Sequence, residues 1–287
     1  MASEIIKSLK VGFRRRWTAG FAKALSVAGA IWLVTSIAAK VSPTFDGAVV
    51  QNGHWYAAVV VFACLVRFVA HIYEVRSVSF AVPTTDSTIS VRFGDLLAER
   101  TDWIIGVGEF FDSEVGHVVS KDSLHGKVIE NVFNGDAQRF RKAVDAALVN
   151  FVGAYTQRGF EPKLKYEIGT TAVVENGPHK IYLVAMSHVD LQTAKASSTV
   201  PMLWDALRGA LTSVTHFGNG APLSLPLIGN GRSSVNIEPQ HLLRLIVLAL
   251  VDFGRKNSLP KIVNVIVPEG CFEMLDIREI QRDWKRR

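Results

Sequence analysis

The chain has 287 residues and a formal net charge of +6. Lys7, Lys10 and Arg14 to Arg16, set against Glu4, supply +4 of this charge, so residues 17–287 carry only +2. Nucleic-acid binding needs basic side chains clustered on a folded domain, and we therefore expect no nucleic-acid partner. The only two cysteines, Cys64 and Cys271, support neither a disulfide framework nor a cysteine-based metal site, which suits a reducing cytosol.

Two apolar segments open the chain, at about residues 21–39 and 55–73, with a polar loop at roughly residues 40–54 between them. Each comes close to the 20 or so helical residues that cross a bilayer core of about 30 Å. Tryptophan and tyrosine side chains lie near the segment ends, as they do at membrane interfaces. Basic residues flank the pair and are almost absent from the loop, so the positive-inside rule places both termini in the cytoplasm. The sequence thus predicts a transmembrane helical hairpin within residues 1–80.

Two other interpretations of this region stay open. The basic run followed by an apolar stretch is also typical of a signal peptide, and the segments could be buried helices of a soluble domain. Arg67 is costly inside a bilayer unless its side chain snorkels to the interface. Alternatively, Arg67 and His71 face neighbouring hairpins in an assembly.

A second domain is expected over residues 81–287, after a linker at residues 74–86. Apolar strands and helices alternate along it. We expect strands at 88–93, 103–107, 164–168, 171–175, 179–188, 222–228 and 261–267, and helices at 136–155, 201–217, 241–253 (capped by Asn236) and 272–284. This alternation predicts an α/β fold with a mostly parallel sheet and helices on both faces. In such folds ligands bind beyond the carboxyl ends of the strands.

The most informative motif is the apolar run Leu223–Ile228, which stops at Gly229, Asn230, Gly231 and Arg232. Glycines at a strand-to-helix turn expose backbone N–H groups that can hold a phosphate, and Arg232 would add charge-assisted hydrogen bonds. An ordinary turn is the alternative, because a second Gly-Asn-Gly occurs at residues 218–220.

Residues after the first two strands are further candidates. Asp95 can accept a hydrogen bond from the exocyclic amine of a base while the Leu96 N–H donates one to a ring nitrogen. An aspartate that only caps a turn or a helix is the more frequent alternative. The stretch from Gly106 to Phe111 combines two glycines with adjacent aromatic rings, Phe110 and Phe111, that could stack on a ligand or pack in the core.

Two histidines could titrate near neutral pH. One is His125, within the stretch Ser123, Leu124, His125 and Gly126; the other is His188, at the end of a strand. A lone histidine is more often an ordinary surface or hydrogen-bonded residue. No P-loop, zinc-protease or nucleophile-elbow motif occurs, and no nucleophile–base pair can be assembled by spacing.

Together these motifs resemble a macro domain, over about residues 86–285. Gly94-Asp95-Leu96 is similar to the family's adenine-reading Gly-Asp-Ile, and residues 123–129 occupy the place of its phosphate-side loop. Residues 225–231, Leu-Pro-Leu-Ile-Gly-Asn-Gly, are similar to its Phe-Pro-Ala-Ile-Gly-Thr-Gly diphosphate strand and loop. The resemblance implies binding of ADP-ribose, with Glu109, Phe110, Phe111, His125 and His188 around its distal part.

Two departures bear on catalysis. Macro-domain hydrolases usually carry asparagine in the loop after the second strand, where this chain has Gly106 to Phe111. Where the hydrolase loop is glycine-rich, this chain has Ser123, Leu124 and His125. We therefore expect ligand binding without enzymatic activity, and no cofactor or metal; a membrane-tethered ADP-ribosyl hydrolase is the alternative.

With two apolar segments in front, the whole chain resembles the membrane-anchored macro-domain effector of the bacterial Thoeris anti-phage defence system. The resemblance implies an inner-membrane protein that senses a signal made from NAD by a TIR-domain partner. For this type the implied signal is histidine-ADP-ribose. Binding would cause homo-oligomeric assembly, disruption of the lipid bilayer and abortive infection.

Overall fold

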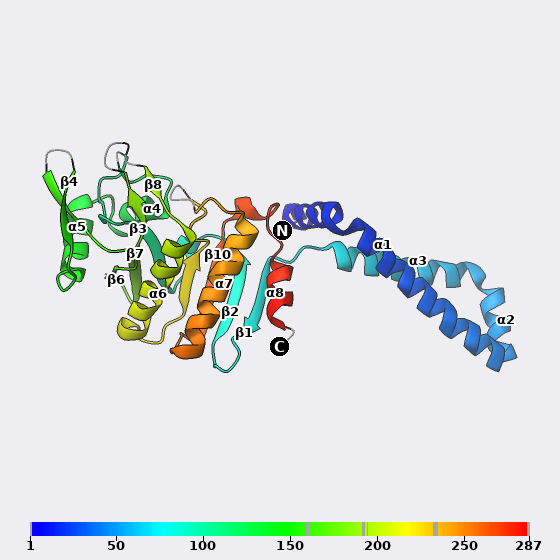
Figure 1. Cartoon of the computed structure of the whole chain (residues 1–287). Helices are drawn as coiled ribbons and strands as arrows, with labels where there is room; N and C mark the ends of the chain where they lie inside the picture. The colour runs from blue at the N-terminus through cyan, green and yellow to red at the C-terminus, as the bar shows by residue number, and fades with distance from the viewer. Residues whose placement is uncertain are drawn as a thin grey trace. The chain divides into compact units, whose positions relative to one another are not determined.

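The computed structural model describes residues 2–116, 118–158, 161–190, 193, 195–231 and 235–285. The chain forms two compact units, Met1–Val75 and Arg76–Arg287 (Figure 1). Each unit is described by itself below.

The first unit consists of helices α1 (Ala2–Val41), α2 (Pro43–Gln51) and α3 (Gly53–Ile72). The expected polar loop is thus wrong in part, because α2 occupies most of it. The Ser42 side chain accepts a hydrogen bond from the Phe45 N–H, and Pro43 fits the first turn of a helix. Helix α1 begins well before the apolar segment and bends at Arg16, whose φ of −137° is not helical.

Helices α1 and α3 pack against each other through small residues. A Cβ on Gly12 would lie 1.5 Å from the carbonyl oxygen of Ile72, and one on Gly20 would lie 3.1 Å from the side chains of Phe68 and Ile72. Glycines that let two backbones approach closely are typical of helix pairs in membranes. The Cys64 thiol also donates to the Ala24 carbonyl oxygen at 3.3 Å.

The apolar side chains of these helices point mainly outward. Ser3–Val41 and Gly53–Ile72 are long and apolar enough to cross a membrane, and only 6% of the most apolar stretch of each is buried. This exposure argues against the interpretation as buried core helices of a soluble domain.

A leucine at Gly12 is expected to separate α1 from α3, because its Cβ cannot fit beside the Ile72 carbonyl group. We expect Gly12→Leu to lower the midpoint of thermal unfolding of the hairpin in detergent, followed by circular dichroism at 222 nm. Gly29→Leu is the matched control on the same helix, since no atom of the described residues lies within 4 Å of a Cβ there. Equal midpoints for the two variants would contradict the close packing.

The second unit contains an eight-stranded mixed sheet among the described residues, in the order β1-β2-β10-β9-β3-β7-β6, with β8 paired to β7. Its central strands, β2 (Thr88–Phe93), β10 (Ile262–Val267), β9 (Leu223–Pro226), β3 (Asp102–Gly108) and β7 (His179–Val189), run parallel. The antiparallel strands are β1 (Ser77–Ala81), β6 (Thr171–Asn176) and β8 (Ala196–Ser197). A separate hairpin joins β4 (Ala154–Arg158) to β5 (Glu161–Lys165).

Helices cover both faces of this sheet, as predicted. Side chains of α4 (Leu124–Val132) and α5 (Ala137–Ala147) share one hydrophobic core with the face of β3 that carries Trp103, Ile105 and Val107. Helices α6 (Val200–Phe217) and α7 (Pro239–Lys256) lie side by side in front of the sheet in Figure 1. Helix α8 (Ile277–Lys285) stacks Trp284 on Phe80 of β1.

Several expected boundaries were wrong. Part of the predicted linker forms β1, and the helix expected to reach residue 155 ends at Ala147, because the buried apolar spacing stops at Leu148. The last expected helix begins only at Ile277, as α8, and a short 3-10 turn, Glu269–Cys271, precedes the expected range. Asn236 does not cap α7: its φ is +57°, and Glu238 precedes the helix, whose first turn contains Pro239.

Candidate ligand-binding site

Two neighbouring cavities lie at the carboxyl edge of the parallel strands. The first has a volume of about 760 Å³ and the second about 550 Å³. Gly106, Ser123 and His125 line both of them. The first cavity falls within the range of roughly 300–1,000 Å³ that small-molecule sites occupy. Because the walls are shared, one elongated ligand could extend from one cavity into the other.

The turn after β9 forms one wall of the first cavity, with Gly229, Asn230 and Gly231. Gly229 has a φ of +90°, and a Cβ there would lie 2.8 Å from Val235, so only glycine fits without strain. Around Gly231 the space is open as far as the described residues go, with none of their atoms within 4 Å of a Cβ. The Asn230 amide donates to the Cys271 thiol at 3.4 Å, and burial raises the pKa of that thiol. Arg232, the fourth predicted residue of this turn, lies outside the described residues.

The N-terminus of α4 forms the facing wall. The Ser123 Oγ accepts the Gly126 N–H at 3.0 Å and donates to the Ser120 carbonyl oxygen at 2.6 Å. Gly126 does not line the cavity; a Cβ there would lie 2.3 Å from the Ser120 oxygen. The N–H groups of Leu124 and His125 have no hydrogen-bond acceptor among the described residues. Free N–H groups at a helix N-terminus favour an anion.

The far end of the first cavity lies beyond β2 and β10. Gly94, Asp95, Leu96, Pro268 and Glu269 line it. The Asp95 carboxylate accepts the Leu97 N–H at 3.1 Å and caps the 3-10 turn Leu96–Ala98. Asp95 can therefore cap this turn and still bind a ligand at the cavity wall, because a carboxylate can accept several hydrogen bonds.

His125 lies at the junction of the two cavities. Its side chain is buried, and its Nε2 has no hydrogen-bond partner among the described residues. Burial lowers the pKa of His125 to about 4, against an opposing effect from the Asp112 carboxylate. The imidazole is therefore neutral at pH 7 and offers a polar atom at the junction.

The second cavity contains polar groups that the sequence analysis missed. Ser187 is fully buried, and its hydroxyl has no partner within the described part of the chain. Asp112 and Lys195 also line this cavity. Strand alternation could have identified Ser187, because it points to the side of β7 opposite His188. No group of three or more metal-ligating side chains gathers among the residues that were described.

Besides Gly126, four predicted residues do not line either cavity: Glu109, Phe110, Phe111 and His188. Phe110 and Phe111 are buried, and Phe111 packs edge-on against Tyr166 in the core, so neither ring offers a stacking face. Glu109 and His188 bind each other, with 2.5 Å between Oε2 and Nδ1. The structure therefore brings together Asp95, Leu96, Ser123 to His125 and Gly229 to Gly231, and leaves Gly126 and these four outside.

Comparison with known proteins places this geometry in a family. The family described as "Thoeris protein ThsA, Macro domain" matches residues 89–268. No curated protein sequence matches the chain. The structure is similar to that of the Oceanobacillus iheyensis macrodomain with ADP, at 13% identity over 72% of this chain and 97% of that one, with a TM-score of 0.50.

The same macrodomain with MES bound matches with 13% identity, coverage of 72% of this chain and 98% of that chain, and a TM-score of 0.50. These similarities show the macro-domain fold, which confirms the predicted α/β fold of the second unit. Because the family match covers well over half of the sequence, the chain belongs to the family of Thoeris ThsA proteins with a macro domain.

Proposed function

We propose that this protein is a membrane-anchored sensor that binds an ADP-ribose-type nucleotide across both cavities. The observation that carries the proposal is the pair of anion-binding turns, at Gly229–Gly231 and at the N-terminus of α4, on the walls of one cavity. A diphosphate between them would be held by backbone N–H groups and by the positive end of the helix.

The rest of the ligand follows from this placement. An adenine ring in the far end of the first cavity would meet Asp95 and the backbone of Leu96. A group attached beyond the diphosphate would pass His125 into the second cavity, which contains Asp112, Ser187 and Lys195. The ADP in the similar Oceanobacillus iheyensis macrodomain supports the nucleotide assignment. The second cavity favours a ligand longer than ADP, such as ADP-ribose or histidine-ADP-ribose.

The Thoeris family suggests what the binding does. A TIR-domain partner would make the signal from NAD, and ligand binding would shift this chain toward an assembled state. A ligand can do so only through a difference in affinity between the two states. The N-terminal hairpin would cross the inner membrane, with both termini in the cytoplasm, and disrupt the bilayer on assembly. Its two long apolar helices support this role.

Isothermal titration calorimetry on the full chain in detergent micelles tests ligand binding. We expect a heat of binding from ADP-ribose and from ADP, and none from inorganic phosphate at the same concentration. The full chain in liposomes loaded with a self-quenching dye tests the effector step, with release expected only after the nucleotide signal is added. Absence of nucleotide binding would refute the sensor; binding without dye release would refute only the effector step.

A second function, ADP-ribosyl hydrolase, is favoured by one observation. The neutral His125 and the acidic Asp112 line the same cavity, where they could activate water. We propose binding without turnover, because the asparagine usual in macro-domain hydrolases is missing after β3. Mass spectrometry of a histidine-ADP-ribose sample after incubation separates the two functions: intact ligand supports the sensor, and free ADP-ribose supports the hydrolase.

A further inference from the structure

A buried carboxylate lies beside residues that line the second cavity. Glu109 follows β3, and its side chain is only 2% exposed. Its Oε2 binds the His188 Nδ1 at 2.5 Å and the Lys165 Nζ at 3.2 Å, while its Oε1 accepts the Val189 N–H at 3.2 Å. Its own N–H donates to the Ser187 carbonyl oxygen at 3.0 Å. Glu109 thus joins the end of β7 to the loop after β3.

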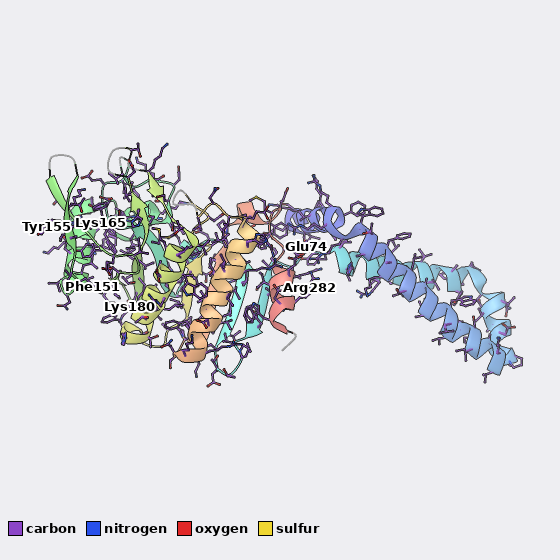
Figure 2. The ribbon with its side chains drawn as sticks, viewed as in Figure 1. Glu74, Phe151, Tyr155, Lys165, Lys180 and Arg282 are labelled. Carbon is purple, nitrogen blue, oxygen red and sulfur yellow. The ribbon has the colours of Figure 1, made fainter. Side chains whose placement is uncertain are left out.

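Two ion pairs connect the β4–β5 hairpin to the same loop. Lys163 and Lys165 are two positions apart on β5 and so point to the same face of the strand. Their ammonium groups lie 3.3 Å from Asp112 and 3.2 Å from Glu109, respectively. The Tyr166 N–H also donates to the Glu109 carbonyl oxygen at 2.9 Å. Figure 2 shows Lys165 on this hairpin, at the upper part of the unit.

The segments that Glu109 holds are those that wall the second cavity. Gly108 and Asp112 flank Glu109 on its own loop, and Ser187 and Val189 flank His188 on β7; all four line that cavity. The two anion-binding turns lie on other segments, after β9 and before α4. Glu109 is therefore connected to one end of the proposed site and not to the other.

We propose that Glu109 is a positioning residue that fixes the wall of the second cavity and so determines binding of nucleotides with a group beyond the diphosphate. The inference rests on the proposed nucleotide site and adds the residue that sets its selectivity. A buried carboxylate keeps its position when cationic and N–H donors satisfy it, and loses that position when the charge is removed. Ser187, Val189 and Asp112 would then no longer hold their places around the distal group.

The test compares two nucleotides on the full chain in detergent micelles, by isothermal titration calorimetry. Glu109→Gln keeps the size of the side chain and removes its charge. We expect it to weaken ADP-ribose binding by roughly tenfold to a hundredfold, the range for a charged hydrogen bond, while ADP binding stays within about twofold. General damage to the fold would weaken both nucleotides alike.

A matched control lies at the other end of the same strand pair. Asp102 begins β3, is equally buried, accepts the Lys180 N–H at 3.0 Å and faces His179 at 3.8 Å. Figure 2 shows Lys180 in the lower part of the unit, away from Lys165. Asp102 lines neither cavity, so Asp102→Asn should not change the ratio of the two affinities.

Lys165→Met provides a second variant, in which Glu109 keeps its His188 and Val189 partners and the replaced lysine side chain is 41% exposed. It should also weaken ADP-ribose selectively. If wild type binds both nucleotides and the ratio is unchanged in Glu109→Gln and Lys165→Met, the positioning role is wrong while the nucleotide site stands. If wild type binds neither nucleotide, the proposed function itself fails, and the inference with it.

Discussion

Gly231→Glu is expected to weaken ADP-ribose binding by roughly a hundredfold or more, because it places a carboxylate beside the proposed diphosphate position. Gly231 lines the first cavity, and no atom of the described part of the chain lies within 4 Å of a Cβ built on it. The new side chain therefore has room and should not disturb folding. Its negative charge would repel the phosphates in a site where backbone N–H groups are the main attraction. Isothermal titration calorimetry on the full chain in detergent measures the loss.

Gly231→Ala is the control for this variant. It adds an uncharged methyl group to the same open space, so its affinity for ADP-ribose should stay within about threefold of that of wild type. A threefold change corresponds to less than about 1 kcal/mol of binding free energy. The neighbouring Gly229 would be a poor choice, because its φ of +90° makes any substitution strained. Equal ADP-ribose binding by Gly231→Glu and Gly231→Ala would exclude the diphosphate from this turn.

Acid is expected to destabilise the second unit through His125. Burial lowers the folded-state pKa of His125 to about 4, below the ordinary value of 6.5. Between these two values the unfolded chain binds more protons than the folded chain, so the free energy of unfolding falls as the pH falls. Integration of this difference gives a loss of about 2 kcal/mol at pH 5 and about 3 kcal/mol at pH 4, relative to pH 7.

Urea unfolding of the full chain in detergent, followed by tryptophan fluorescence, measures this loss at pH 7, 5 and 4. Other groups titrate over the same range, so the comparison is with His125→Gln, which cannot protonate. We expect the stability of wild type relative to this variant to decrease by about 2 kcal/mol between pH 7 and pH 5. If the free energies of unfolding of wild type and His125→Gln differ by the same amount at every pH, the loss of stability in acid does not come from His125.

Residues in local motifs were predictable because backbone geometry and neighbouring residues decide their roles. Gly229–Gly231 after an apolar strand required only glycine conformations. Asp95 after β2 follows the same logic, since parallel strands end at one edge of the sheet. Ser123 was identified by the resemblance of residues 123–129 to a macro-domain loop, and helix α4, which it caps, was not predicted. The α/β fold class was confirmed. It was predictable because apolar strands that alternate with helices form a sheet that must be covered on both faces.

The loop after β3 shows what sequence could not decide. The register between β3 and β7 shifts between Val107 and Gly108, and Phe111 has a φ of +49°. Beyond such a bulge, the alternation of side chains no longer tells which residue faces a cavity. Phe110 and Phe111 therefore enter the core, and Glu109 turns toward His188, although all three follow a strand that leads to the site.

The sequence by itself determined the two apolar N-terminal segments, the α/β domain and the glycine turn that faces the first cavity, because these depend on composition and short-range spacing. Only the tertiary structure showed that Gly12 lets α1 and α3 touch, and that Ser187 and Asp112 share a second cavity with His125. Gly12 and Ile72, like His125 and Ser187, lie far apart in the chain. The second cavity exists only once the strands pair in the order β9-β3-β7, which no local pattern specifies.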